Sequence, residues 1–404
     1  MTAENSNQRR SPVRLHAGSS HDAFHIPSLD GLRAVAILIV FSSHAGLDKL
    51  VPGGFGVTLF FFLSGYLITT LLRREFESTG GISLSEFYIR RIFRIWPPFY
   101  FVLLVGFAVT AAGLYHTRLE PSPVLAQIAH FANYYVVDYG KEYPAPPGVT
   151  PGSWLLWSLA VEEHFYLLFP LLYLSLLKRG VAPLRQMQIF IGLCVGVLAW
   201  RCVLVYVLDA PSVRTYFATD TRIDSILFGC ALGVFGNPLY APRDGKSGER
   251  LLKYALLPAC IAVLLATFLL RSPHFRETLR YTLQSAALFP LFIAAVRFPE
   301  WFLFRPLNWN WMRYLGTLSY SFYLIHLTII ITVGYLFKTL HPAALAVLAL
   351  SLSILGSHFI HVAVELPFGR LRRRLLARHA GAGRERSSGG NEAERRKWAA
   401  LLGG

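Results

Sequence analysis

Two ionisable residues in a mostly apolar stretch are the first candidates for chemistry. Arg33 and His44 lie eleven residues apart in SLDGLRAVAILIVFSSHAG. In a helix this spacing turns the two side chains to within about 20° of each other and separates them by about 16 Å along the axis. A neutral imidazole can act as a general base, and a guanidinium binds anions. The alternatives are that Arg33 extends to lipid headgroups and that His44 hydrogen-bonds a neighbouring helix.

A second set of polar residues lies in GSWLLWSLAVEEHFYLLFPLL. Ser158, Glu162 and Tyr166 recur every four residues, so a helix places them on one face. Glu163 points about 100° away from that face. Because a buried carboxylate can orient an imidazole and stabilise its cation, we expect Glu162 to support His44 if their helices meet. Ser158 and Tyr166 are then candidates for contact with substrate.

Arginines form a third candidate group. Arg91 and Arg94 in FYIRRIFRIWPP are three residues apart and share a helix face. Basic residues at the inner end of a membrane helix can simply anchor it. A pair of planar guanidinium groups is equally what a phosphate-bearing ligand requires.

The remaining candidates are weaker. Arg222 and Asp224 in TDTRIDSILFGCALG form either an ion-pair cluster at a helix start or further contacts to substrate. The lone His326 in LGTLSYSFYLIHLTII is interpreted as a packing residue. His361 and Glu365 have i, i+4 spacing, but no third ligand follows at a suitable distance, so no metal site is predicted.

These residues must be positioned by helices in a bilayer. Hydrophobic residues make up 54% of the 404-residue chain and charged residues 15%, against about 25% charged in a typical soluble domain. A membrane-spanning helix needs about 20 mostly apolar residues, and ten segments of the chain approach this length. They predict an all-α polytopic membrane protein with ten helices. The predicted spans are 30–47, 54–72, 95–113, 154–177, 187–208, 222–236, 254–270, 280–296, 315–337 and 342–363. A short amphipathic segment, 122–136, belongs to the long connection between the third and fourth spans.

The charge distribution predicts the orientation. The net charge of +16 does not indicate a nucleic-acid partner, because the basic residues cluster between apolar stretches and in one tail. With the N-terminus inside, inner segments carry 28 Lys and Arg and outer segments carry 9, which favours two cytoplasmic termini. We expect a disordered cytoplasmic tail over 1–27, a membrane domain over 28–368, and a basic, disordered cytoplasmic tail over 369–404.

Six segments resemble, in order, the sequence blocks of the acyltransferase-3 family of membrane O-acyltransferases. They are SLDGLRAVAILIVFSSH, GVTLFFFLSGYLI, FYIRRIFRIWP, WSLAVEEHFYLLFP, TRIDSILFGC and LGTLSYSFYLIHL. The resemblance covers residues 28 to about 367. It implies transfer of an acyl group, commonly acetyl, from acyl-coenzyme A to a hydroxyl of a sugar, glycolipid, polysaccharide precursor or macrolide.

The resemblance also implies roles for residues. His44 corresponds to the catalytic histidine, and Arg33, Arg91 and Arg94 to essential arginines that would serve catalysis or bind the donor. Glu162 falls in the matching block. Acyl-coenzyme A would be a co-substrate, with no tightly bound cofactor, in a protein of the bacterial cytoplasmic (inner) membrane.

The sequence leaves two mechanisms open. The acceptor hydroxyl can attack the thioester directly, or an acyl-histidine can form first. Ser158, Tyr166 and backbone amides are all candidates for stabilising the oxyanion. A transporter or flippase of a glycolipid or small molecule would also use ten helices with interior charges, although the two halves show no repeat.

Overall fold

The computed structural model describes residues 26–115, 117–140, 148–242 and 245–377, and every regular element in these ranges is a helix. This confirms the all-α membrane fold. The ten longer helices are α1 (Pro27–Ser42), α2 (Gly53–Thr79), α3 (Leu84–Ala111), α6 (Trp157–Lys178), α7 (Pro183–Tyr206), α9 (Thr219–Val234), α11 (Leu257–Leu269), α13 (Leu279–Arg297), α14 (Asn310–Leu336) and α15 (Pro342–Ile360). The five short ones are α4 (Pro121–Ile128), α5 (Ala132–Tyr139), α8 (Ser212–Phe217), α10 (Lys246–Leu251) and α12 (Pro273–Glu277).

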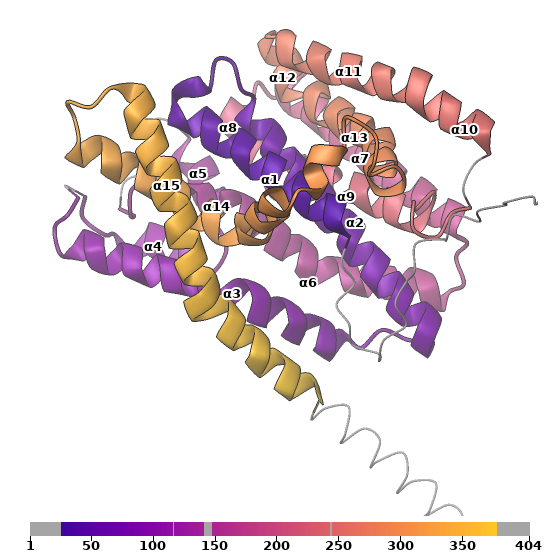
Figure 1. Ribbon diagram of the computed structural model, residues 1–404, viewed down its shortest axis with the longest axis horizontal. Coiled ribbons are helices and arrows are strands. Elements are labelled where there is room, and N and C mark those ends of the chain that lie inside the picture. The colour runs from indigo at the N-terminus through magenta and orange to yellow at the C-terminus, as the bar shows by residue number, and fades with distance from the viewer. Residues whose placement is uncertain (1–25, 116, 141–147, 243–244, 378–404) are drawn as a thin grey trace, which may run out of the picture.

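The helices form one bundle around α1, α2, α9 and α14 (Figure 1). α1 packs between α2 and α14, while α9 packs against α2 and α7. The amphipathic segment predicted in the long connection forms α4 and α5, which lie outside the central helices. The bundle therefore brings the helices that carry Arg33, Ser64 and His326 into contact.

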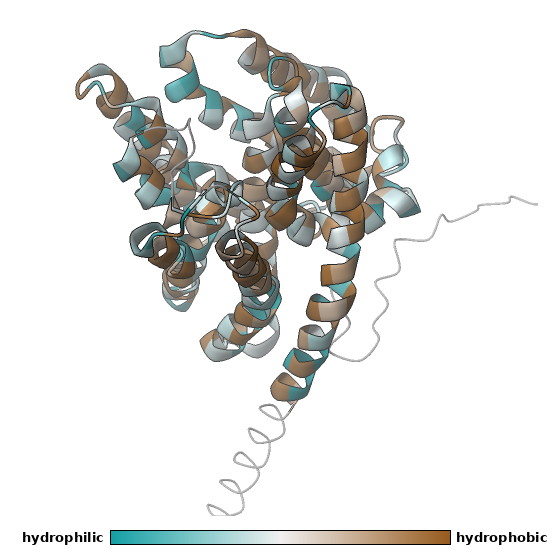
Figure 2. Cartoon of the chain, turned by 90° about the vertical axis from the view of Figure 1, so that its left-hand side faces the viewer, coloured by the Kyte–Doolittle hydropathy of each residue, from teal (hydrophilic) through white to brown (hydrophobic). Residues whose placement is uncertain are grey.

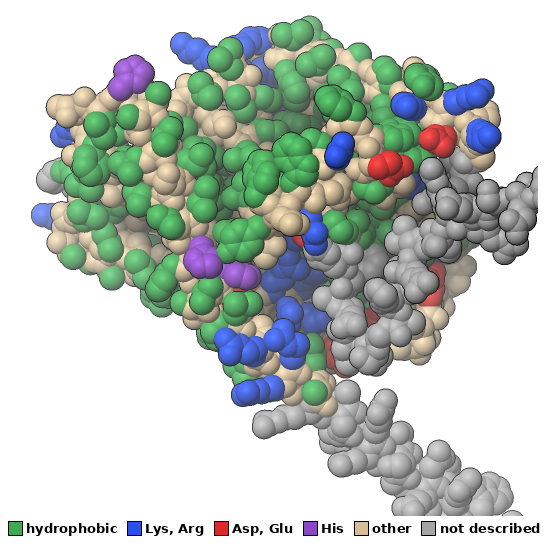
Figure 3. Space-filling model, in the orientation of Figure 1, with side chains coloured by type: hydrophobic (Ala, Val, Ile, Leu, Met, Phe, Trp, Pro, Cys, Tyr) green, Lys and Arg blue, Asp and Glu red, His purple; other side chains and the backbone are tan. Residues whose placement is uncertain are grey.

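Apolar side chains cover the outside of the bundle. Leu167, Leu168 and Leu171 on one face of α6 are 60%, 63% and 50% exposed, and Figure 3 shows hydrophobic side chains spread over the visible face. Hydrophobic residues also run along α15, with hydrophilic ones toward its C-terminal end (Figure 2). So much exposed apolar surface fits a lipid environment rather than water.

Nine helices of the described residues are long and apolar enough to cross a membrane. The predicted span 222–236 is the exception, because it corresponds to α9, which has 16 residues. A helix of this length rises about 24 Å, less than the roughly 30 Å of a hydrocarbon core. α9 is buried along almost its whole length, so protein surrounds it.

Glycines set the close contact of α9 with α2. A Cβ atom at Gly65 of α2 would lie 1.9 Å from the carbonyl oxygen of Ile226, and one at Gly229 of α9 would lie 2.0 Å from that of Phe62. Any larger residue would push the two backbones apart. This contact fixes the rotation of α2, which places Ser64 on the side of α6.

The C-terminal helix extends beyond the predicted end of the membrane domain. α15 continues through the π-helical turn His361–Glu365, and the helix runs to Ala377. Residues 369–377 are therefore helical, because leucines among the arginines maintain an amphipathic pattern. The tails predicted over 1–27 and 369–404 otherwise lie outside the described residues.

Reporter fusions after residues 140 and 390 will determine the number of spans. With ten spans, residue 140 follows three crossings and residue 390 follows all ten, so we expect opposite signals from a reporter that is active on one side only. If α9 does not cross, residue 390 follows nine crossings and the two signals will match. Matching signals would contradict two cytoplasmic termini.

Candidate functional site

Two cavities meet in the middle of the bundle. The arginine cavity, of about 120 Å³, is lined by Arg33, Arg91, Arg94, Ser158, Glu162 and Tyr166, among others. The histidine cavity, of about 660 Å³, is lined by His44 and opens at the opposite end of α1. Val57 and Tyr323 line both cavities, so only these side chains and their neighbours separate the two spaces.

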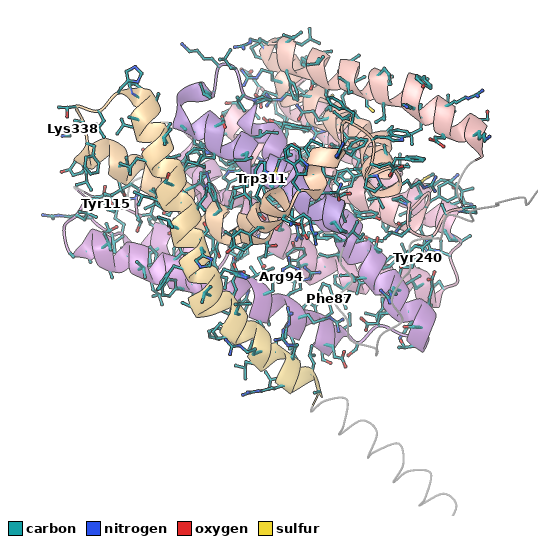
Figure 4. The ribbon with its side chains drawn as sticks, in the orientation of Figure 1. Phe87, Arg94, Tyr115, Tyr240, Trp311 and Lys338 are labelled. Carbon is teal, nitrogen blue, oxygen red and sulfur yellow. The ribbon has the colours of Figure 1, made fainter. Side chains whose placement is uncertain are left out.

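The arginine cavity gathers three cations. α1 contributes Arg33 and α3 contributes Arg91 and Arg94, which the shared helix face predicts. Arg33 lies 3.6 Å from Asp30, and the guanidinium of Arg91 lies 5.4 Å from the centre of the Tyr166 ring. Within the described parts of the chain, no carboxylate lies within ion-pair distance of Arg91 or Arg94. In Figure 3 a recessed group of Lys and Arg side chains lies near the middle of the face where Figure 4 labels Arg94.

Ser64, Glu162 and Tyr166 form a closed hydrogen-bonded triangle at this cavity. The Ser64 hydroxyl donates to Glu162 Oε1 at 2.9 Å, and the Tyr166 hydroxyl donates to Glu162 Oε2 at 3.0 Å. The two hydroxyl oxygens are 2.8 Å apart. The carboxylate is therefore held in place opposite the arginines.

The structure does not bring Glu162 to His44. The residue before α6 that reaches His44 is Trp154, whose ring lies edge-on at 6.3 Å. Glu162 follows Trp154 by eight residues, which separates the two residues by about 12 Å along a helix axis. Helix periodicity predicts which face a residue occupies, but not which depth of a neighbouring helix it meets.

His326 is the partner of His44. His44 Nδ1 lies 3.2 Å from His326 Nε2. On its other side, His326 Nδ1 lies 2.8 Å and 3.2 Å from the carbonyl oxygens of Tyr323 and Phe322. The packing role predicted for His326 misses this contact, although an ionisable side chain inside an apolar span is the same signal that selects His44.

The hydrogen-bond partners assign the tautomers of both rings. Carbonyl oxygens only accept, so His326 Nδ1 carries a hydrogen and a neutral His326 keeps its lone pair on Nε2. His44 Nδ1 must then donate to that lone pair. The lone pair of a neutral His44 therefore lies on Nε2, the nitrogen that His326 leaves free.

A local change in the helix presents His44 to its cavity. His44 lies in the π-helical turn Ser43–Leu47, which continues from α1. Gly46 adopts a φ of 100°, a left-handed conformation that favours glycine, and the helix ends there. π-helical turns occur frequently at functional sites, because they re-aim a side chain within an otherwise regular helix.

Arg222 and Asp224, predicted as substrate contacts, line neither cavity. Both are fully buried on α9, where surrounding helices enclose their side chains. Asp224 forms an ion pair of 2.7 Å with the equally buried Arg201 of α7. Arg222 packs against aromatic rings, 4.0 Å from the centre of Tyr281. Asp224 therefore neutralises a structural arginine, and Arg222 hydrogen-bonds the carbonyl oxygen of Tyr216 and the hydroxyl of Thr58.

The other predicted residues have simple partners. Ser158 Oγ lies 2.7 Å from the Tyr323 hydroxyl, at the place where the two cavities meet. His361 Nδ1 lies 2.7 Å from Glu365 Oε2, and Glu365 also accepts from Ser321. The i, i+4 spacing of His361 and Glu365 therefore serves a local hydrogen bond between the two side chains.

Comparison with known proteins gives a family match and three informative relatives. A family model described as an acyltransferase domain matches residues 26–362. The chain is 31% identical over 319 residues to the peptidoglycan O-acetyltransferase OatA of Listeria monocytogenes, covering 76% of this chain and 49% of that protein. It is 32% identical over 322 residues to the putative peptidoglycan O-acetyltransferase YrhL of Bacillus subtilis, with the same coverage.

A putative O-acetyltransferase of Staphylococcus aureus strain COL is 29% identical over 347 residues, covering 85% of this chain and 57% of the relative. The chain thus spans about half the length of these curated relatives. No solved structure shows a significant match.

Proposed function

Since this chain belongs to the acyltransferase domain family, we propose that it moves an acyl group, commonly acetyl, from acyl-coenzyme A to a hydroxyl of a saccharide acceptor. The observation that supports this most directly is the pair of cavities that meet at Val57 and Tyr323. One cavity offers guanidinium groups and the other a histidine base. We place the reaction at the bacterial cytoplasmic membrane, and the names of the relatives favour a cell-wall saccharide over a macrolide.

The arginine cavity suits a donor with phosphates at one end and a slender arm at the other. At about 120 Å³ the cavity is smaller than a typical small-molecule site of 300–1,000 Å³. The nucleotide part of coenzyme A therefore stays at the mouth, where guanidinium groups bind phosphate. Arg372, on the extension of α15, lies within electrostatic reach of Arg94 and adds a further cation there.

In the proposed reaction His44 is the general base. Its Nε2 takes the proton of the acceptor hydroxyl, and the oxygen attacks the thioester carbonyl carbon. A C–O bond forms, the C–S bond breaks, and the coenzyme A thiolate recovers a proton from the imidazolium. His326 fixes the ring of His44 through Nδ1, which is the role first assigned to Glu162.

Glu162 then belongs to the donor side. Its carboxylate faces three arginines whose charges would otherwise repel one another, and Ser64 and Tyr166 hold it there. The oxyanion has a candidate donor in the Ser158 hydroxyl, which lines the arginine cavity, whereas the Tyr323 hydroxyl donates to the carbonyl oxygen of Leu155.

A thiol-release assay tests the proposed function. Purified protein with acetyl-coenzyme A is expected to release free thiol only when a saccharide acceptor is present. The acetylated product should appear in equal amount. A transporter or flippase would release no thiol, so the absence of acceptor-dependent release over a panel of cell-wall saccharides would contradict the proposal.

Replacing Arg91 or Arg94 with alanine is expected to weaken coenzyme A binding by about 10- to 100-fold, because each change removes a charged hydrogen bond worth roughly 1.5–3 kcal/mol. Calorimetric isotherms in detergent measure the affinity. Arg179→Ala, an exposed arginine on the α6–α7 connection, is the matched control and should bind normally. Unchanged affinity in the Arg91 and Arg94 variants would return both residues to membrane anchoring.

A further inference from the structure

The wall of the histidine cavity carries more positive charge than base catalysis requires. Residues 271–280, which join α11 to α13 and include the first residues of α13, contribute Arg271, Arg276 and Arg280 to the lining, and the α1–α2 connection contributes Lys49. Arg271 donates to the backbone carbonyl of Lys49 at 2.8 Å, which ties the two connections together. Four cations from two segments thus surround one opening.

Acidic residues neutralise this wall only in part, although Glu277 lies within electrostatic reach of Arg280. Asp48 and Glu277 also line the cavity, and the Glu277 carboxylate accepts from the Thr215 hydroxyl. Among the described residues, neither carboxylate lies within ion-pair distance of Arg276 or Arg280. The lining therefore keeps a net positive charge.

Arg280 is held with its donors near the cavity. One Nη donates to the Tyr281 hydroxyl at 2.8 Å, and the guanidinium stacks 4.8 Å from the centre of that ring. Its Nε is buried without a hydrogen-bond partner among the described residues. Arg276, on the adjacent helix α12, is exposed at the rim. One partly buried and one exposed guanidinium suit the capture of an oxyanion.

A buried cation adds to the same field. Arg222 is fully buried, and its guanidinium lies 4.0 Å from the ring centre of Tyr281, 5.1 Å from Tyr216 and 5.6 Å from Trp157. These three residues also line the histidine cavity. Within the described chain no carboxylate pairs with Arg222, so its charge acts through the rings with little screening.

We propose that the histidine cavity selects an acceptor saccharide that carries an anionic group, a phosphate or a carboxylate, which Arg276 and Arg280 bind. The rings of Trp154, Trp157 and Tyr216 pack against the sugar, and the hydroxyl to be acylated reaches His44. This inference rests on the proposed function, since it assigns the substrate class of that site. A neutral sugar would leave the cationic wall without a counter-charge.

Calorimetry on the full-length protein in detergent, without coenzyme A, tests the subsite. The probes are N-acetylglucosamine, its 1-phosphate and glucuronic acid, which separate neutral, phosphate and carboxylate ligands. We expect one charged sugar or both to bind at least about tenfold more tightly than the neutral one, as a charge-assisted contact implies. The charged probe that binds more tightly identifies the anion, and added salt should reduce the preference.

The double variant Arg276→Gln/Arg280→Gln should lose the preference, and Arg276→Gln alone should reduce it without disturbing the fold, because Arg276 is exposed. Arg118 is an exposed arginine on the α3–α4 connection, and Arg118→Gln is the control that should keep the preference for charged sugars.

Equal binding of all three sugars, no binding of the charged ones, or a preference that survives the double variant would each overturn the subsite. Acceptor-dependent thiol release with no charge preference would overturn the subsite alone. Charge-selective binding without any acyl transfer would overturn the proposed function alone.

Discussion

Replacing His44 with alanine is expected to lower acyl transfer by about a hundredfold to ten-thousandfold, the range that general-base catalysis supplies. Coenzyme A affinity should change by no more than about twofold, because Arg33, one of the arginines proposed to bind it, lies about 16 Å away along the helix axis, and Arg91 and Arg94 lie on α3. The half-buried ring of His44 contacts His326 and Trp154. Its loss should therefore leave the fold intact while removing the only imidazole that lines the histidine cavity within the described chain.

Transfer rate, coenzyme A isotherms and thermal unfolding should be measured on the same preparation. His358→Ala is the matched control, since His358 lies on α15, lines neither cavity and hydrogen-bonds Tyr314. A folded His44→Ala protein that transfers at close to the wild-type rate would refute the base mechanism. A variant that loses coenzyme A binding as well would refute the separation of donor and base into two cavities.

Spacing along one helix was the most informative signal in the sequence. The eleven-residue interval predicts one shared face for Arg33 and His44; in the structure Arg33 lines the arginine cavity, and His44, in the π-helical turn after α1, lines the histidine cavity. The same reasoning correctly groups Ser158, Glu162 and Tyr166. Local periodicity is sufficient wherever the relation lies within a single helix.

Relations between helices could not be predicted in this way. The partner of Asp224 is Arg201, 23 residues away on α7, and the partner of His44 is His326, 282 residues away on α14. Such contacts depend on the depth and rotation at which helices pack, which close approaches such as that of Gly65 to Ile226 determine. The expected pairing of Glu162 with His44 failed for this reason.

The length of α9 has a similar explanation. A hydropathy window recognises a span by its apolar residues, but α9 is apolar because protein encloses it. Its 16 residues need not match the bilayer thickness, since almost all of its side chains are buried against other helices. Sequence alone does not distinguish burial in protein from burial in lipid.

Replacing His326 with leucine is expected to lower the turnover of acyl transfer by about a hundredfold or more, although His326 lines neither cavity. His44 Nδ1 would lose its acceptor, so the ring could rotate or carry its hydrogen on Nε2, where it cannot accept the hydroxyl proton. Loss of the group that sets a catalytic histidine's tautomer has cost up to about ten-thousandfold in another enzyme class. Coenzyme A affinity should stay unchanged.

His326→Gln separates this positioning role from packing. Its side-chain oxygen can accept from His44 Nδ1 at about the place of His326 Nε2, whereas leucine fills the fully buried site with apolar atoms. If His326 positions His44, glutamine should restore turnover by about tenfold or more over leucine, even if it lowers thermal stability. If His326 only packs, leucine should be at least as active as glutamine, because an unsatisfied buried amide costs more than a buried alkyl group. Measuring turnover and unfolding temperature for both variants decides between the two, and a leucine variant more active than the glutamine variant would remove His326 from the mechanism.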